Sequence, residues 1–441
     1  MKALMIFGYE WKHFIRTPFK LVALLLFVAA GIFALHNGAS LYERQKNEIT
    51  KLNEKAQSEI EETLAFYEAG KQGPEERPWV NLSEPFWANW YTPTYHFKQA
   101  SPAIAYNIGQ AEQYGFYKRV TFMSSPYDPD MAEEIANPER LQAGTLDFSF
   151  VSLFLLPLLL LVCLYNVKGA ESDGGFLPLV MVQSGGQFTW LLSRVSFYFA
   201  LLALTTLGLM LYGALLTGVF ESATSAFVSI YLLIVGYLLF WTTAFVLIIR
   251  RGGSSIGNTF AMVGVWLLFT FFIPAATQQW VSTVYPANLM TDLIDAQRDK
   301  KNELYNSPDS VFQARLDKLY PNLAQTIVAQ DSSRIQAALY DSSVALTNEL
   351  TKESTTKIEA GNERKNALIR TSYWFNPLTF TQHQLNRLSQ TDYYDYLQYR
   401  QEVQTLIEGQ INRLVLDTWN GIVVGKEKYL EYNAELDSEG K

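Results

Sequence analysis

The stretch FSFVSLFLLPLLLLVCLYNV, residues 148–167, decides the fold class of this chain. It carries no charged residue, and about 20 residues is the length that a helix needs to cross a hydrocarbon core of about 30 Å. Four further apolar runs of comparable length are present: Phe19–His36, Val195–Phe220, Ala226–Ile249 and Thr259–Ala276. The sequence therefore predicts an α-helical polytopic membrane protein with five transmembrane helices.

The composition of the 441 residues agrees with this prediction and excludes several classes of function. Hydrophobic residues make up 49% of the chain, and the charged residues lie mostly between the apolar runs, which indicates large water-facing parts. A net charge of −8 disfavours nucleic acid as a partner, because phosphate binding needs a basic face. The lone cysteine, Cys163, allows no disulfide framework, and the four histidines form no local metal motif. We therefore expect no metal, no cofactor and no catalytic residue in this chain.

Lysine and arginine residues near the spans predict the orientation, because cationic flanks resist translocation. They precede the first span and lie in alternate loops: Lys2, Lys12, Arg16, Lys20, Lys168, Arg194, Arg250 and Arg251. The prediction is a cytoplasmic interfacial helix (1–18), a first span (19–36), an extracytoplasmic segment (37–147), spans two to five (148–276) with a cytoplasmic loop (168–194), and an extracytoplasmic helical segment (277–441). A sixth, closing span is not seen.

The two long segments are expected to form one mainly helical extracytoplasmic domain. Apolar residues between 41 and 69 largely follow the helical period, so a helix should continue out of the first span and stop at Gly70. An aromatic, proline-punctuated stretch follows, which includes Trp79, Trp87, Trp90 and Tyr91. These rings could form a stacking platform for a substrate, or they could fill the core of the domain or lie at the bilayer surface. We favour the interpretation that they fill the core of the domain or lie at the bilayer surface.

Two segments on the expected cytoplasmic side have patterns that suit contacts with a partner or a lipid surface. Residues 4–18 predict an amphipathic interfacial helix with Glu10, Trp11 and Arg16, in which apolar and basic residues follow separate stripes. In the loop 168–194, a short helix should lie between glycine pairs and present apolar side chains beside an acidic one: Glu171, Gly174, Gly175, Phe176, Leu177 and Leu179. Such a helix could insert into a groove on a soluble partner, or it could be a connector that rests on lipid.

These segments resemble those of type-2 ABC transporter permeases. The stretches Asn137-Pro138, Leu141 to Asp147 and Trp374 to Pro377 are similar to the branch of that family with large extracytoplasmic insertions. The resemblance implies a six-span permease of the bacterial inner membrane, paired with a second copy or a sister permease and surrounded by membrane lipids. It also implies a separate cytoplasmic ABC ATPase that holds ATP and Mg²⁺ and is coupled through residues 168–190.

The leading hypothesis is therefore a permease subunit of an ATP-driven exporter, or of a lipid or peptide extruder, that is not itself an enzyme. A secondary carrier is disfavoured, because the spans are nearly free of the ionisable residues that such carriers keep along their pathway. The alternative is a mechanotransmission or structural subunit whose outer domain acts on an extracytoplasmic partner. A membrane-anchored enzyme is a third and weaker hypothesis.

Overall fold

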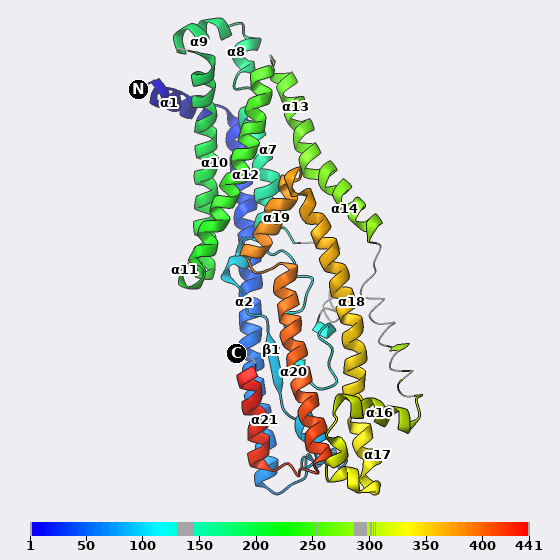
Figure 1. Ribbon diagram of the computed structural model, residues 1–441. Helices are drawn as coiled ribbons and strands as arrows, with labels where there is room; N and C mark the ends of the chain where they lie inside the picture. Colours follow the sequence, from blue (N-terminus) through cyan, green and yellow to red (C-terminus); the bar gives the residue numbers. More distant parts are fainter. Residues whose placement is uncertain are drawn as a thin grey trace.

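The chain forms an elongated helical molecule, with a bundle at one end and a mixed, mostly helical domain at the other (Figure 1). The computed structural model describes residues 2–129, 145–184, 186–252, 254–285, 298, 299, 302, 304 and 306–439. Within these residues, five helical stretches are long and apolar enough to cross a membrane: Pro18–Glu68, Phe148–Asp173, Gln187–Thr217, Thr224–Arg251 and Ser255–Val284. The five spans expected from the sequence are thus confirmed as candidate spans, with longer bounds.

The bundle contains the N-terminal helix and the elements between residues 148 and 284. Its elements are α1 (Lys2–Ile15), the first part of α2 (Pro18–Glu68), α6 (Phe148–Phe150), the π-helix η2 (Val151–Leu155), α7 (Leu156–Leu164), α8 (Gly169–Asp173), α9 (Leu177–Ser184), α10 (Gln187–Thr217), α11 (Val219–Ser222), α12 (Thr224–Arg251), α13 (Ser255–Leu267), the π-helix η3 (Leu268–Phe272) and α14 (Ile273–Val284).

We call residues 41–129 and 306–439 the distal domain. Its elements are the rest of α2, α3 (Pro85–Trp90), β1 (Thr94–Phe97), η1 (Pro102–Ala105), β2 (Tyr117–Val120), α16 (Asp309–Leu319), η4 (Leu323–Gln325), η5 (Val328–Gln330), α17 (Ser332–Asp341), α18 (Ser343–Thr371), η6 (Ser372–Trp374), α19 (Pro377–Leu388), α20 (Tyr393–Trp419) and α21 (Lys426–Glu439). The strands form a two-stranded antiparallel sheet, which the expectation of a mainly helical domain did not include.

Helix α2 connects the two parts of the molecule without interruption. It begins at Pro18, where the missing N–H costs nothing because the first helical residues have no intrahelical acceptor. Its 51 residues extend over about 77 Å, more than twice a hydrocarbon core of about 30 Å. The helix expected over residues 41–69 is therefore present as the continuation of the first span, and it ends at Glu68, two residues before Gly70.

Separate apolar cores hold the bundle and the distal domain. The bundle core joins side chains from α1, α2, α7, α10 and α12, and it also includes Leu378 and Leu385 from α19. The larger core of the distal domain combines Val120 and Phe122 with residues between Leu316 and Trp419. Residues between the first and second candidate spans therefore pack into one core with residues after the fifth.

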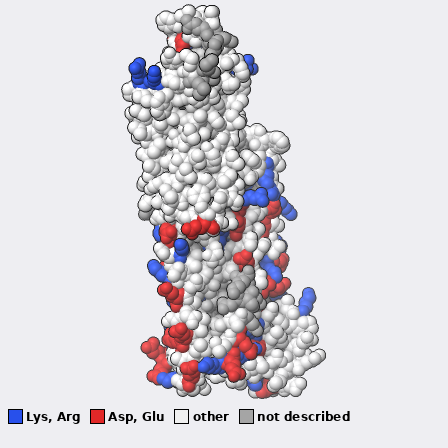
Figure 2. Space-filling model, turned by 90° about the vertical axis from the view of Figure 1, so that its left-hand side faces the viewer, with Lys and Arg blue, Asp and Glu red and all other residues white. Residues whose placement is uncertain are grey.

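The charged side chains divide the surface into zones. On the face shown in Figure 2, a broad band over the bundle carries no Lys, Arg, Asp or Glu, whereas charges of both signs cover the distal domain. A few basic side chains lie near the end of the bundle that is farther from this domain. A charge-free band of this kind is what a hydrocarbon environment selects, because an exposed charge there is costly.

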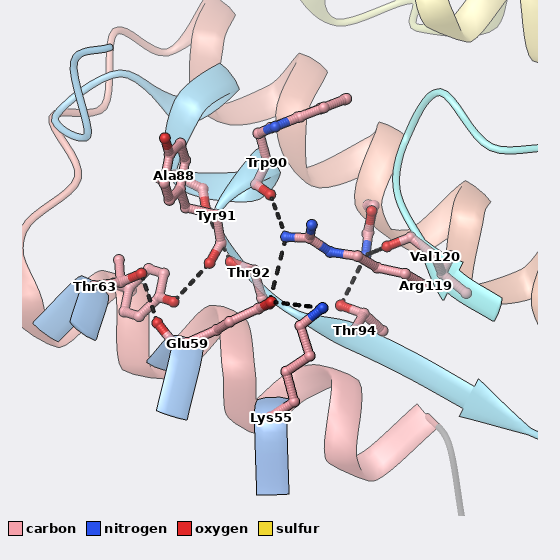
Figure 3. A network of polar contacts seen from close by, with 12 residues as sticks. Lys55, Glu59, Thr63, Ala88, Trp90, Tyr91, Thr92, Thr94, Arg119 and Val120 are labelled. Carbon is pink, nitrogen blue, oxygen red and sulfur yellow. Dashed lines mark hydrogen bonds and ion pairs between the residues drawn. The ribbon is translucent and has the colours of Figure 1, made fainter. Parts of the chain in front are cut away.

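An ion-pair network attaches the distal half of α2 to the sheet (Figure 3). The Glu59 carboxylate lies 3.8 Å from Lys55 Nζ and 3.6 Å from Arg119 Nη2, and Arg119 Nη2 also donates to the carbonyl of Trp90 at 3.4 Å. Tyr429 of α21 donates from its hydroxyl to the carbonyl of Tyr91 at 2.9 Å. The last residue of α3 is thus bonded through its carbonyl to Arg119 of β2, and the next residue, Tyr91, is bonded through its carbonyl to α21.

A test of the packing between the bundle and the distal domain uses Gly38 of α2. A Cβ atom at this position would lie 2.7 Å from Ala105 Cα and 2.8 Å from Ala105 O, which is closer than non-bonded atoms approach. We expect Gly38→Ala to lower the free energy of unfolding by about 1–3 kcal/mol, because η1 must move away from α2. Gly236→Ala in α12 is the control, since no atom lies within 4 Å of its added Cβ. Thermal unfolding in detergent measures the stability of both variants. Equal melting temperatures of Gly38→Ala and Gly236→Ala would contradict the close packing of η1 on α2.

Candidate functional site

The candidate site lies at the end of the bundle where α8 and α9 connect α7 to α10 (Figure 1). The chain turns between the two short helices at Gly174 and Gly175, and Gly175 adopts a φ of 73°, a left-handed conformation that side chains with a Cβ rarely take. Helix α9 therefore begins at Leu177, as a short helix between the two glycine pairs that the sequence indicated.

A buried guanidinium group joins three elements at this site. Arg194 of α10 places Nε 2.5 Å from the carboxylate of Glu10 in α1, and its Nη1 pairs with the carboxylate of Glu171 in α8. The same Nη1 donates to the carbonyl of Val167 at 2.6 Å. The side chains of Arg194 and Glu10 are 8% and 6% exposed. Two carboxylates and a carbonyl therefore compensate one desolvated cation, the arrangement in which removal of either partner is costly.

A second buried cation lies deeper in the same end of the bundle. Lys20 of α2 donates from Nζ to the carbonyl of Cys163 at 2.7 Å and to the hydroxyl of Tyr198 at 3.2 Å. Its Nζ also lies 4.6 Å from the centre of the Tyr198 ring, within the range of a cation–π contact. Because these partners belong to α7 and α10, Lys20 fixes three spans to one another.

Helix α8 is also bonded to the loop between α12 and α13. Lys168, which precedes α8, donates from Nζ to the carbonyls of Ile249, Arg250 and Gly252 at 3.3, 3.2 and 2.8 Å. These carbonyls lie at the C-terminal end of α12, where a cation offsets the unpaired acceptors and the helix dipole. At the other end of α8, the Asp173 carboxylate accepts from the backbone N–H of Ser255 at the start of α13, at 3.2 Å.

We call the group Glu10, Lys168, Glu171, Asp173 and Arg194 the α8 hub. These five side chains connect α8 and the preceding Lys168 to α10, α12 and α13, and through Arg194 to α1. Polar contacts of this kind hold a fixed geometry, whereas apolar contacts alone allow sliding. A displacement of α8 should therefore be transmitted to several spans together.

Beside the hub, α9 presents apolar side chains outward. Phe176, Leu179 and Val182 are 63%, 58% and 84% exposed, whereas Leu177 is half-buried and packs against the bundle core. The expected set of apolar contact residues is thus divided: Phe176 and Leu179 remain available to a partner or to lipid, and Leu177 holds α9 on the bundle.

The residues of the interfacial helix have different environments. Glu10 is buried in the hub, whereas Trp11 and Arg16 are exposed. The ring of Trp11 lies 6.4 Å from that of Phe14, which is buried in the bundle core.

The sequence analysis used Arg194 only to predict the orientation and did not connect Glu10 with Glu171. The signal in the sequence was the arginine itself, since Arg194 is the only charged residue among the 31 residues of α10.

The four aromatic residues considered for a stacking platform do not share a surface. Trp79 is 65% exposed, whereas Trp87, Trp90 and Tyr91 are half-buried. Trp90 packs against Phe122, with ring centres 5.9 Å apart, at the margin of the distal core. Of the four rings, Trp90 is the one that packs against the larger core of the distal domain.

Within the described residues, no group of three or more His, Cys, Asp or Glu side chains is arranged to hold a metal ion. The stretches Asn137-Pro138 and Leu141 to Gly144, which contributed to the resemblance with ABC permeases, lie outside the described residues.

Comparison with known proteins identifies one segment. Residues 292–431 match the family model described as a domain of unknown function, DUF3526. The match covers about a third of the chain. It includes the part of the distal domain from α16 to the start of α21, and thus also α19, which packs on the bundle. Neither the curated proteins nor the solved structures contain a match.

Replacement of the buried guanidinium tests the hub. Arg194→Leu leaves the Glu10 and Glu171 carboxylates without their cation, so the free energy of unfolding should fall by about 3–5 kcal/mol. Arg16→Leu is the matched control, because Arg16 is exposed in the turn between α1 and α2 and should change stability by less than about 0.5 kcal/mol. Thermal unfolding in detergent gives both values.

A neutralised triple variant separates charge from packing. Glu10→Gln and Glu171→Gln combined with Arg194→Met should regain most of the stability that Arg194→Leu loses, because no unpaired charge stays buried. If Arg194→Leu melts like the wild type, or if the triple variant is no better than Arg194→Leu, the hub is not held by its charges.

Proposed function

We propose that this chain is the permease subunit of an ATP-driven ABC transporter of the bacterial inner membrane, coupled to a separate cytoplasmic ATPase through α8 and α9. In this proposal the N-terminus and the α8 hub face the cytoplasm and the distal domain lies outside. The function is export, or extrusion of a lipid or peptide. A second copy or a sister permease completes the membrane part.

The observation that carries the proposal is the combination of an exposed apolar face on α9 with the polar bonds of α8. A helix that receives a force from a soluble ATPase needs a surface for docking and a firm connection to the spans. Phe176 and Leu179 offer the first, and the α8 hub supplies the second. A lipid-resting connector would require the apolar face but not the bonds to α1, α10, α12 and α13.

The opposite end of the bundle has a matching connection to the distal domain. Asn107 is fully buried; its Nδ2 donates to Asn386 Oδ1 at 2.9 Å, and its Oδ1 accepts from Gln382 Nε2 at 3.0 Å. Gln382 and Asn386 belong to α19, whose Leu378 and Leu385 lie in the bundle core. We call η1, residues 106–108 and α19 the junction.

The junction is bonded to several spans. The hydroxyl of Tyr106 donates to the carbonyl of Met210 in α10 at 2.9 Å. The Asp147 carboxylate accepts from the N–H of Phe150, in the first turn of the second candidate span, at 2.8 Å and from the N–H of Ile108 at 3.3 Å. Burial raises the pKa of Asp147 from its usual range, while these hydrogen bonds oppose that shift. A tilt of the spans should therefore move the distal domain.

The same connection favours a second candidate function, mechanotransmission. In that alternative the spans carry no substrate, and the ATPase uses them to move the distal domain against an extracytoplasmic partner. The continuous α2, which belongs to both the bundle and the distal domain, suits this alternative as well as transport. Transport of a molecule into or out of vesicles, measured with the reconstituted complex, separates the two functions.

The docking surface can be tested by copurification. The chain is expressed with its native genomic neighbours, purified in mild detergent, and its bound proteins are identified by mass spectrometry. We expect a soluble P-loop ATPase in stoichiometric amount, and its loss when Phe176→Asp and Leu179→Asp are combined, because buried carboxylates would oppose docking. Leu177→Asp is less suitable, since Leu177 packs on the bundle.

The control for this experiment is Val423→Asp, which places the same charge on a 76% exposed residue of the distal domain. It should leave ATPase binding unchanged. Recovery of the chain without an ATPase, or equal ATPase binding by the α9 variant and the wild type, would contradict the proposed coupling.

A further inference from the structure

A cleft of about 890 Å³ lies in the distal domain, and no residue of the hub or of the junction lines it. Its walls are the distal half of α2, with Asn53 and Gln57, and α20, with Gln398 and Glu402. Strand β1 and the residues up to Gln99 line it between these helices, and Figure 1 shows β1 between α2 and α20. None of the features described above uses this cleft.

The strand that lines the cleft has one unpaired edge. The register pairs Tyr95 with Arg119 and Phe97 with Tyr117, and the same register is continued by Lys98, whose N–H donates to the carbonyl of Phe116 at 2.8 Å. In an antiparallel pair, hydrogen-bonded and non-hydrogen-bonded positions alternate. Lys98 is hydrogen-bonded to β2, so Phe97 and Tyr95 are the positions whose backbone groups point away from β2.

These outward-pointing backbone groups have no partner within the described part of the chain. No hydrogen bond there involves the N–H or the C=O of Tyr95 or Phe97. Unpaired strand edges bind additional strands, because an extended chain offers donors and acceptors with the same two-residue repeat. Ordinary sugar hydroxyls lack this fixed repeat, so the edge is better matched to a peptide.

The walls of the cleft suit the same kind of ligand. Side-chain amides both donate and accept hydrogen bonds, so Asn53, Gln57 and Gln398 can bond to peptide groups on either side of an added strand. A cavity of about 890 Å³ is in the range of small-ligand and short-peptide sites, which measure roughly 300–1,000 Å³. The rings of Tyr95 and Phe97 are nearly parallel, with centres 6.4 Å apart, and offer apolar contacts to alternate side chains.

The charges in the cleft restrict the peptide. Two carboxyl groups line the cleft: that of Glu402, which lies 3.0 Å from His96 Nε2, and that of Asp395. Lys98 is the one lysine of the lining, and its Nζ already donates to the carbonyl of Gln390. The lining thus holds two carboxyl groups and one lysine. An anionic peptide is disfavoured, and an uncharged or cationic one is favoured.

We propose that this cleft binds an extended peptide segment, uncharged or cationic, as an additional strand on the free edge of β1. The site belongs to the distal domain alone, so the proposal does not depend on coupling to an ATPase. If the chain is a permease, the peptide is either a transported molecule or a segment of a partner protein; binding by the isolated full chain does not distinguish these sources, whereas transport in vesicles does.

The first test compares three probes by fluorescence polarisation with the full chain in detergent. The parent probe is a fluorescein-labelled heptapeptide, Lys-Thr-Val-Thr-Val-Thr-Lys. The second is the same peptide with every internal amide N-methylated, which keeps the side chains and removes the backbone donors. The third is labelled chitohexaose. We expect saturable binding of the parent peptide, and binding at least about tenfold weaker after N-methylation.

Three outcomes of this comparison overturn the proposal. They are no saturable binding of the parent peptide up to about 1 mM, equal binding of the methylated peptide, and binding of chitohexaose in place of the peptide. The last outcome would identify the cleft as a glycan site that uses the Tyr95 and Phe97 rings.

A matched pair of variants tests the strand edge itself. Phe97→Pro removes one outward-pointing N–H and leaves the bonds of β1 to β2 intact, a place where proline is tolerated in a strand. Phe97→Ala keeps the N–H and removes the ring. We expect Phe97→Pro to weaken parent-peptide binding at least about tenfold, and Phe97→Ala to weaken it less than about threefold.

Equal losses in the two variants would show that the ring, not the edge, binds the ligand, and would overturn the proposal. Thermal unfolding verifies that Phe97→Pro is folded. If it is not, the comparison of parent and methylated peptides on the wild-type chain still decides the question.

Discussion

The guanidinium group of Arg194 is the constraint on which the rest of the membrane part depends. A cation that is 8% exposed at the end of an apolar bundle must have compensating charge, and Glu10 and Glu171 supply it from two other elements. Because these partners lie on α1 and α8, the N-terminal helix and the loop between the second and third candidate spans cannot move independently of α10. Lys168 and Asp173 then extend the same constraint to α12 and α13.

The molecule therefore has polar connections at both ends of an apolar bundle. At one end the α8 hub gathers the spans, and at the other end Asn107, Gln382 and Asn386 bond the junction to the distal domain. Between these ends the spans pack mainly through apolar contacts, which tolerate small rotations better than hydrogen-bonded networks do. This distribution supports the proposed function, in which an ATPase moves one end and the distal domain responds at the other. The cleft beside β1 gives that domain a surface on which such a movement could act.

The apolar runs in the sequence predicted the helices of the bundle well. Each feature of the structure that the sequence did not predict has its own physical reason. All five candidate spans follow from run length, and the continuation of α2 follows from apolar periodicity. The strands β1 and β2 are four residues each, too short for a period-2 pattern to be recognised among so many aromatics. The hub could not be predicted because Glu10, Glu171 and Arg194 are far apart in the sequence. Leu177 differs from Phe176 and Leu179 only in the side of α9 that it occupies, which depends on how the helix packs. The orientation in the membrane, the ATPase partner and the export direction stay predictions from flanking charges and resemblance.

The most direct measurement of the central claim is the distance between the bundle and the distal domain during the ATPase cycle. Spin labels on Leu215→Cys, at the end of α10, and Val423→Cys, in the distal domain, are both on exposed residues, and the native Cys163 is buried. Pulsed electron resonance is recorded on the complex with its ATPase, without nucleotide and with a non-hydrolysable ATP analogue. The account predicts that nucleotide shifts the distance distribution between these labels. An unchanged distribution in a complex that binds nucleotide and hydrolyses ATP would contradict it.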